Sequence, residues 1–229
     1  MKQVIKVIIP AQNEENAVGL VIDEIPKDFV DEIIVVDNGS TDETFKIAED
    51  AGATAITESQ HGYGKACLTG IEYALKNDPR PDIIVFIDGD RSDYPDQLPK
   101  LVKPIINNEV DFVIGSRAKG NKEDGSMTFP QVFGNWLATT LLRWFYGAKF
   151  TDLGPFRAIR TSSLIALKMR DEDFGWTVEM QIKAVKKGLR YLEVPVNYRK
   201  RIGFSKISGT IKGTLSAGYK IIWTIIKYL

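Results

Sequence analysis

An apolar run that ends in a cluster of carboxylates is the feature that most constrains this chain. Residues 83–87 are Ile, Ile, Val, Phe and Ile, and Asp88, Asp90 and Asp93 follow directly. A β-branched run of this length predicts a buried strand, and open α/β sheets bind their ligands at the carboxyl ends of such strands. The three aspartates therefore mark the first candidate site.

Two interpretations of these aspartates compete. Asp and Gly after a strand also form ordinary turns, so a turn alone would explain Asp88 and Gly89. The third carboxylate favours a functional interpretation, because like charges this close repel one another unless a cation compensates them. Oxygen ligands select hard divalent ions. We therefore expect Asp88, Asp90 and Asp93 to hold Mg²⁺ or Mn²⁺.

The pattern of an apolar run, a polar turn and a helical stretch recurs along the first half of the chain. Strands are predicted at residues 2–9, 32–36, 54–57, 83–87 and 110–115. This alternation predicts an α/β fold with a mostly parallel, doubly wound sheet and helices on both faces.

The second half of the chain is less regular. Residues 118–128 are polar and glycine-rich, which predicts a loop at the rim of the site. Residues 130–146 predict a helix with an aromatic stripe, a pattern more typical of a core than of a membrane interface. Further helices and a strand at residues 190–194 complete a predicted catalytic domain of residues 1–198.

The remaining segment, residues 199–229, has a distinct charge pattern. The whole chain of 229 residues has 30 basic and 30 acidic residues, yet no acidic residue follows Glu193. A basic loop is predicted first, and residues 211–229 then predict an amphipathic helix. Such a helix either lies in a membrane interface or docks on its own domain or on a second subunit, and the sequence leaves both open.

Composition excludes several classes of protein. A formal net charge of zero provides no global field for nucleic acid. One cysteine, Cys67, allows no internal disulfide, and one histidine, His61, allows no multi-histidine zinc site. We find no apolar run of the roughly 20 residues needed to span a bilayer and no signal peptide. We therefore expect a cytoplasmic protein.

Five short motifs, taken in order, resemble the nucleotide-sugar-dependent glycosyltransferases of family 2. They are residues 7–15, 35–42, 62–66, 88–90 and 115–117. Within that family, residues 152–157, 194–196 and 201–206 are most similar to the dolichol-phosphate mannose synthase type. The resemblance implies a GT-A, Rossmann-like fold and an inverting, metal-dependent transfer from a UDP- or GDP-sugar. It implies a polyprenyl phosphate acceptor at the cytosolic face of a membrane.

The resemblance also implies roles for single residues. Asp37 would contact the nucleobase, while Asp88 and Asp90 would contact the ribose or the diphosphate and the metal. Arg117 would contact the acceptor phosphate, and Arg201 would belong to a basic loop that closes over the phosphates. The other substrate-binding positions it implies are Pro10, Ala11, Asn13, Glu15, Gly39, Asp42, Gly64, Lys65, Gly89, Arg157, Ser205 and Lys206.

The chemistry of the acceptor determines whether a base is needed. A phosphate monoester is anionic at neutral pH, so it needs positioning more than deprotonation. A hydroxyl acceptor would require a general base, for which Glu179 and Asp152 are the candidates. A nucleotidyltransferase and a non-enzymatic nucleotide-sugar-binding module are the alternatives outside the glycosyltransferases.

The chain departs from the family pattern at three places. Ser92 and Asp93 stand where the synthases have Gln and His, so Asp93 is an additional metal ligand candidate. A second acceptor arginine is missing before the aromatic helix, which leaves Arg117 and Arg143 to share that task. The basic loop is one residue shorter, so either Lys200 or Arg201 faces the phosphates.

Overall fold

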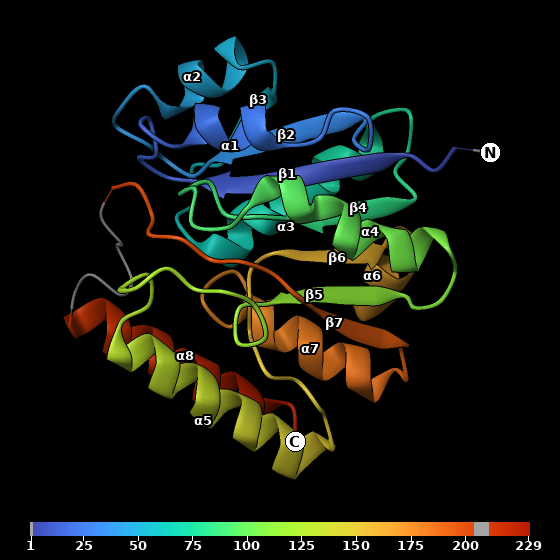
Figure 1. The fold of residues 1–229 in the computed structure, drawn as a ribbon, viewed down its shortest axis with the longest axis vertical. Coiled ribbons are helices and arrows are strands. Elements are labelled where there is room, and N and C mark those ends of the chain that lie inside the picture. Colours follow the sequence, from blue (N-terminus) through green and yellow to red (C-terminus); the bar gives the residue numbers. More distant parts are fainter. Residues whose placement is uncertain (1, 204–210) are drawn as a thin grey trace.

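The computed structural model describes residues 2–203 and 211–229 and, within them, a seven-stranded sheet (Figure 1). The strand order is β3-β2-β1-β4-β6-β5-β7. Every neighbouring pair is parallel except the two that involve β6. The strands are β1 (Ile5–Ala11), β2 (Glu32–Asp37), β3 (Thr54–Thr57), β4 (Ile83–Phe86), β5 (Phe112–Ser116), β6 (Arg157–Arg160) and β7 (Tyr191–Pro195).

Helices cover both faces of this sheet, as the alternating sequence pattern predicts. They are α1 (Val18–Glu24), α2 (Thr44–Asp50), α3 (Tyr63–Lys76), α4 (Leu98–Ile106), α5 (Phe129–Tyr146), α6 (Thr161–Leu167), α7 (Trp176–Lys186) and α8 (Ile211–Lys227). Val7 of β1 packs in a core cluster with α1 and α4, whereas the adjacent Ile8 packs in a cluster with α3 and α7. Consecutive strand residues point to opposite faces, so an unbroken apolar strand is required here.

The central strands end at one edge of the sheet, and this edge positions the candidate site. The parallel register pairs Ala11 with Asp37 and Ile8 with Phe86. The polar residues that follow β1, β2 and β4 therefore emerge side by side. The mostly parallel, doubly wound sheet predicted from the sequence is confirmed, and β6 is the strand that reverses direction.

The aromatic helix is present, but its predicted burial is wrong. Helix α5 spans Phe129–Tyr146, and its buried residues are Ala138, Thr139 and Leu142. Phe129 is 80% exposed and Trp144 is 75% exposed. Most aromatic residues of α5 face outward, because α7 and α8 cover only one side of the helix; Tyr146, at its last turn, is the partly buried exception.

The helix predicted at the C-terminal end is confirmed as α8, which packs against α5 and α7 (Figure 1). The Tyr146 hydroxyl donates to the carbonyl of Ile225 over 2.5 Å, and the Tyr228 hydroxyl donates to Glu179 over 2.5 Å. Among the described residues, the helices are too short or too polar to cross a bilayer.

Candidate active site

A cavity of about 550 Å³ opens at the carboxyl edge of β1, β2 and β4. Several residues predicted from the sequence line it together, and they come from loops far apart in the chain. These lining residues are Pro10, Ala11, Asp88, Gly89, Asp90 and Arg201. The sheet register explains their convergence, since parallel strands that end at one edge deliver their following loops to one place.

The carboxylates after β4 lie close together and differ in their hydrogen bonding. The Tyr63 hydroxyl donates to Asp88 over 3.1 Å, and burial together with the charge of Asp90 raises the pKa of Asp88 to about 7. Asp90 accepts hydrogen bonds at Oδ1 from the backbone N–H and the hydroxyl of Ser92, at 2.8 and 2.5 Å. Its Oδ2 lies 3.2 Å from the Arg201 guanidinium.

Asp93 is the least satisfied member of this group. It is 1% exposed, and neither of its carboxylate oxygens has a hydrogen-bond partner within the described residues. Burial raises the pKa of Asp93 well above its usual range, and the charge of Asp88 raises it further. A buried carboxylate of this kind is costly unless a proton or a cation neutralises it.

These carboxylates fit a divalent cation by their chemistry. The orphaned oxygens of Asp93 and the mutual repulsion of Asp88 and Asp90 are features that a bound cation would relieve. In residues 2–203 and 211–229, no three acidic, His or Cys side chains are arranged to enclose an ion. The side chains of this loop would therefore have to rotate toward an ion.

Arg201 provides the positive wall of the cavity. Its guanidinium lies 2.9 Å from Glu14 and 3.2 Å from Asp90, so it bridges the loop after β1 and the carboxylate loop. Lys200 instead bonds Glu123 through its backbone N–H and is not among the lining residues. Arg201, rather than Lys200, therefore faces the cavity. Ser205 and Lys206 lie outside the described residues.

Arg117 and Asp152 form a buried pair beside this cavity. The Arg117 guanidinium donates to both oxygens of Asp152, at 2.9 and 2.6 Å, and the Arg117 backbone N–H adds a bond of 2.7 Å. Arg117 also lies over the ring of Tyr198, 5.1 Å from its centroid. Both oxygens of Asp152 are thus engaged, and the pair would have to open before Asp152 could accept a proton.

Asp152 also lines a second cavity, of about 290 Å³, beside α5. Lys122 and Arg143 contribute positive charge there, while Val132 and Trp136 contribute apolar surface. This arrangement suits a ligand with an anionic head and an apolar body.

Glu179 is not brought to either cavity. It is fully buried in α7 and accepts bonds from the backbone N–H groups of Arg170 and Asp171, from Lys183 and from Tyr228. Burial raises its pKa, but the bonds from Lys183 and Tyr228 outweigh that effect and leave the pKa lowered. A carboxylate with four donors and a lowered pKa serves to hold α7, α8 and the loop before α7 together, so the placement of Glu179 does not fit a general base.

Arg157 also differs from its predicted placement. It is fully buried, and its guanidinium donates to the backbone carbonyls of Leu153, Gly154 and Thr177. Burial lowers its pKa to about 10. Arg157 does not line the cavity and instead ties the turn before β6 to the start of α7.

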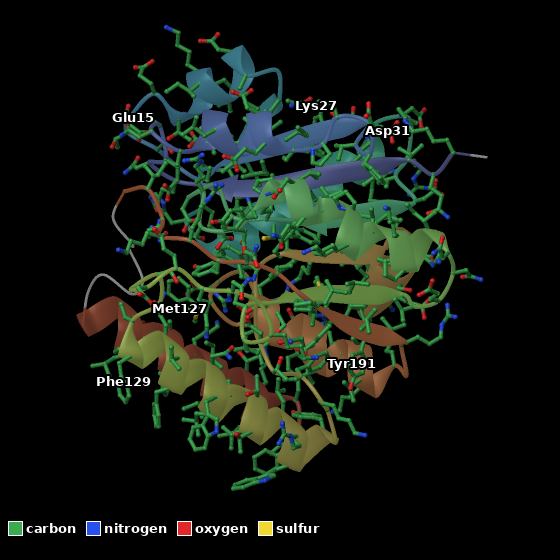
Figure 2. The ribbon with its side chains drawn as sticks, in the orientation of Figure 1. Glu15, Lys27, Asp31, Met127, Phe129 and Tyr191 are labelled. Atoms are coloured by element: carbon green, nitrogen blue, oxygen red, sulfur yellow. The ribbon has the colours of Figure 1, made fainter. Side chains whose placement is uncertain are left out.

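Several predicted residues hold the loops around the cavity rather than facing it. Asn13 accepts a 2.7 Å bond from the Thr41 backbone N–H, and Asp37 accepts one of 3.2 Å from Ser40. Asp42 accepts bonds from Thr44 and from the backbone N–H of Glu15, which is labelled at the left edge of the molecule in Figure 2. These bonds tie together the loops that follow β1 and β2.

The glycines at this edge allow close approaches of the backbone. Gly39 has a φ of 76°, in the left-handed region. A Cβ on Gly64 would lie 2.2 Å from the carbonyl of Asp171. The Lys65 backbone N–H donates to the Glu172 carbonyl over 2.8 Å, and its ammonium lies 3.9 Å from the Glu172 carboxylate. Gly64 and Lys65 thus dock the loop before α7 onto the start of α3.

Sequence reasoning missed a further part of the lining. Four of the missed lining residues lie inside or beside the recognised motifs, so the motifs themselves could have indicated them: Gln12, Glu14, Asn38 and His61. Gln12 and His61 are linked at 3.1 Å. Asp173 and Phe174 had no such signal, because only the docking of their loop on α3 brings them to the cavity.

Comparisons with known proteins agree with this geometry. Residues 6–167 match the model of the family described as glycosyl transferase family 2. The chain is 31% identical over 248 residues to the UDP-N-acetylglucosamine–dolichyl-phosphate N-acetylglucosaminyltransferase of Methanococcus voltae, covering 98% of this chain and 95% of the relative. It is 31% identical over 220 residues to the undecaprenyl-phosphate mannosyltransferase of Micrococcus luteus, covering 90% of this chain and 88% of the relative.

Solved structures identify the fold. The glucosyl-3-phosphoglycerate synthase of Mycobacterium tuberculosis, in complex with Mn²⁺, UDP and glucosyl-3-phosphoglycerate, superposes with a TM-score of 0.76 and 24% identity, covering 99% of this chain and 80% of that chain. The sheet therefore has the GT-A, Rossmann-like fold. Because the family model spans more than half of the chain, the protein belongs to glycosyl transferase family 2 and is a glycosyltransferase.

Proposed function

We propose that this glycosyltransferase transfers a sugar from a UDP- or GDP-sugar to a polyprenyl phosphate, with inversion and with Mg²⁺ or Mn²⁺. The main observation in favour of a nucleotide-sugar donor is the cavity in which Asp88 and Asp90 face Arg201. Two relatives named for transfer to polyprenyl phosphates support the acceptor half.

The charges of the cavity suit a nucleoside diphosphate. A divalent cation held by Asp88, Asp90 and Asp93 would stabilise the negative charge that develops on the leaving diphosphate. Arg201 would exchange its bonds to Glu14 and Asp90 for bonds to the phosphates, which charge-assisted guanidinium bonding favours. Gln12 and His61 also line the cavity, and we assign the contact with the nucleoside to them.

The second cavity is the proposed acceptor site. Its basic residues Lys122 and Arg143 would hold the lipid phosphate, and Trp136 and Val132 would contact the first isoprene units. Because the acceptor oxygen is already anionic, the protein has to position it against the sugar rather than deprotonate it. The paired Arg117 and Asp152, which adjoin this cavity, would orient that phosphate.

An exposed apolar face supports a lipid substrate at a membrane. Helices α5 and α8 lie side by side (Figure 1). Both helices carry large exposed apolar side chains. They include Phe129, Val132, Phe133, Trp136, Leu215, Tyr219, Trp223 and Ile226. Residues 129–146 and 211–229 contain four basic residues and no acidic residue. A basic apolar face of this kind binds anionic lipid surfaces, so we propose peripheral contact with the cytosolic face of a membrane.

A hydroxyl acceptor would need a general base, and the candidate carboxylates are poorly placed for that role. Asp93 and Glu179 line neither cavity, and Asp152 is paired with Arg117. If Asp93 serves as a cation ligand, D93N should raise the Mn²⁺ concentration needed for half-maximal transfer while the product stays the same.

The test is a donor and acceptor panel with the purified chain. Bound UDP or GDP with Mn²⁺ should first raise the melting temperature. Sugars of the binding nucleotide are then offered with undecaprenyl phosphate in anionic vesicles or with phosphoglyceric acid in solution. Sugar transfer to the lipid, with release of UDP or GDP, supports the proposal. Released pyrophosphate would instead identify a nucleotidyltransferase, and binding without any product would identify a binding module.

A further inference from the structure

Glu24, the last residue of α1, connects two segments that both reach the cavity although it does not line the cavity itself. Its Oε1 accepts bonds from the Arg91 guanidinium at 2.9 and 2.6 Å, and its Oε2 accepts a bond from the Arg199 guanidinium. Arg91 belongs to the carboxylate loop, residues 88–94. Arg199 belongs to the arginine segment, residues 198–203, which carries Arg201.

Arg199 binds the carboxylate loop directly as well. Its guanidinium donates to the backbone carbonyls of Arg91, at 2.7 Å, and of Asp93, at 3.2 Å, and lies over the ring of Tyr94 at 4.4 Å from the centroid. The Arg199 backbone N–H donates to the carbonyl of Ser92 over 2.9 Å. The fork of one guanidinium thus fastens several points of the loop, which an ammonium group could not reproduce.

The same pairing sets the position of Arg201 relative to Asp90. The Ile202 backbone N–H donates to the Asp90 carbonyl over 3.0 Å, and Asp93 and Tyr198 form an antiparallel bridge. Arg201 lies between these contacts, and its guanidinium reaches Asp90 in the cavity. A shift of the arginine segment along the carboxylate loop would therefore displace Arg201 from Asp90.

The local energetics show why an acidic residue is needed at this point. Arg91 has a φ of 62°, in the left-handed region that disfavours residues other than glycine. Glu24 lies between the guanidinium groups of Arg91 and Arg199, which would repel each other without its negative charge. The carboxylate loop, whose aspartates also repel one another, would then lose this attachment to α1. Burial raises the pKa of Glu24, but hydrogen bonds and charges from Arg199 and Arg91 outweigh this and lower it. Glu24 is therefore ionised at neutral pH.

We propose that Glu24 and Arg199 are positioning residues that hold the carboxylate loop and the arginine segment in register, so that cation ligands and Arg201 approach one diphosphate together. The proposal rests on the proposed donor site. Glu24 contacts no substrate in it and acts only through Arg91 and Arg199.

Hydrogen exchange tests the clamp without any ligand. In E24Q, the amides of Arg199 and Ile202 should exchange faster, because their bonds to Ser92 and Asp90 lose the anchor. The matched control is D23N, which removes the same charge from the neighbouring residue of α1. The side chain of Asp23 is exposed and makes no hydrogen bond or ion pair with the described residues. Unchanged exchange of both amides in E24Q would overturn the proposal.

Calorimetry with UDP and GDP, with and without Mn²⁺, tests the consequence for the site. E24Q should weaken Mn²⁺-dependent binding roughly 10- to 100-fold, as loss of a residue that orients metal ligands does, and should weaken metal-free nucleotide binding less, because only Arg201 contributes to the metal-free complex. R199K should have the same effect. The double variant E24Q/R199K should bind nucleotide with Mn²⁺ no more weakly than the weaker-binding single variant, because both changes break the same contact. Equal loss with and without metal would overturn the positioning role. A wild-type protein that binds neither nucleotide would contradict the proposed function, and the exchange experiment would then decide on the clamp.

Discussion

Asp90 occupies the central position in the candidate site. One of its carboxylate oxygens accepts two bonds from Ser92, and the other pairs with Arg201. The first contact fixes the side chain, and the second places its negative charge at the wall of the cavity. A fixed carboxylate that faces a removable cationic partner is suited to hold a metal ion when a diphosphate takes over that partner.

Replacing Asp90 by Ala should lower kcat by at least about 100-fold, in the range found when a residue that stabilises developing charge is removed. The measurement is the initial rate of sugar transfer at saturating Mn²⁺. D96N is the matched control, since Asp96 is exposed and has no bonded partner in the described chain. Turnover of D90A at the wild-type rate, with metal chelated, would rule out the metal mechanism.

Asp88 makes stability depend on pH. Its pKa is raised to about 7 in the folded protein, mainly by burial and then by Asp90. The native state therefore retains a proton that the unfolded state loses above its ordinary pKa of about 4. The contribution of Asp88 to stability is therefore fully present below about pH 4 and is lost as pH rises through about 7.

Urea titrations of the metal-free protein at pH 5 and pH 7.5 measure this effect. The wild-type protein should lose more unfolding free energy between these pH values than D88N, by roughly 1.4 kcal/mol for each pKa unit spanned. Asn at position 88 can still accept the bond from Tyr63, so the comparison isolates the charge. Identical pH dependence in the two proteins would show that the Asp88 pKa is not raised.

At the scale of elements, α8 connects the exposed face to the wall of the first cavity. Tyr228 bonds Glu179, which holds the backbone N–H groups of Arg170 and Asp171. The Lys220 ammonium lies 3.3 Å from the Asp171 carboxylate. The loop that begins there supplies Asp173 and Phe174 to the lining. Helix α8 therefore supports this loop, in addition to any contact it makes outside the protein.

Replacing Tyr228 by Phe should destabilise the protein by about 1–3 kcal/mol, because a buried carboxylate loses one of its donors. Chemical denaturation measures the loss. Y219F serves as the control, since Tyr219 is on the same helix, is 71% exposed, and its hydroxyl makes no hydrogen bond with the described residues. Equal stability of the two variants would mean that the bond to Glu179 contributes nothing.

The exposed face of α5 and α8 should bind anionic vesicles. The double variant F133S/W223S removes one large apolar side chain from each helix and should weaken binding at least tenfold, given about 25 cal/mol for each Å² of apolar surface. Phe129, at the start of the same face in Figure 2, remains in place. I165S is the control, since Ile165 is 49% exposed on α6. The measurement is co-sedimentation with anionic vesicles at constant salt. Equal binding by the wild type, F133S/W223S and I165S would exclude this face as the membrane contact.

At the scale of the whole molecule, local sequence patterns were sufficient to predict the sheet and its ligand edge. Each strand from β1 to β5 carries its own apolar run, and its register follows from parallel packing. The reversed direction of β6 has no local signal, because it depends on pairing with β4 and β5, which lie far away in the sequence.

The candidate site was predictable where a motif faces the cavity, as at Asp88, Asp90 and Arg201. Prediction failed where a long-range partner decides the role of a residue. Arg157 donates its hydrogen bonds to backbone carbonyls, and Glu179 accepts one from Tyr228. The local sequence does not reveal either set of partners. The aromatic residues of α5 follow the same rule, since their exposure depends on how much of the helix α7 and α8 cover.

A competition between two lipids that differ only in the phosphate tests the central proposal most directly. The purified chain is given the nucleotide sugar that it binds, Mn²⁺, and vesicles with equal amounts of undecaprenyl phosphate and undecaprenol. Mass spectrometry of the lipid extract then identifies the acceptor. The proposed function predicts a glycosylated polyprenyl phosphate and no glycosylated alcohol. Glycosylated undecaprenol, or transfer only to a soluble hydroxyl, would contradict it.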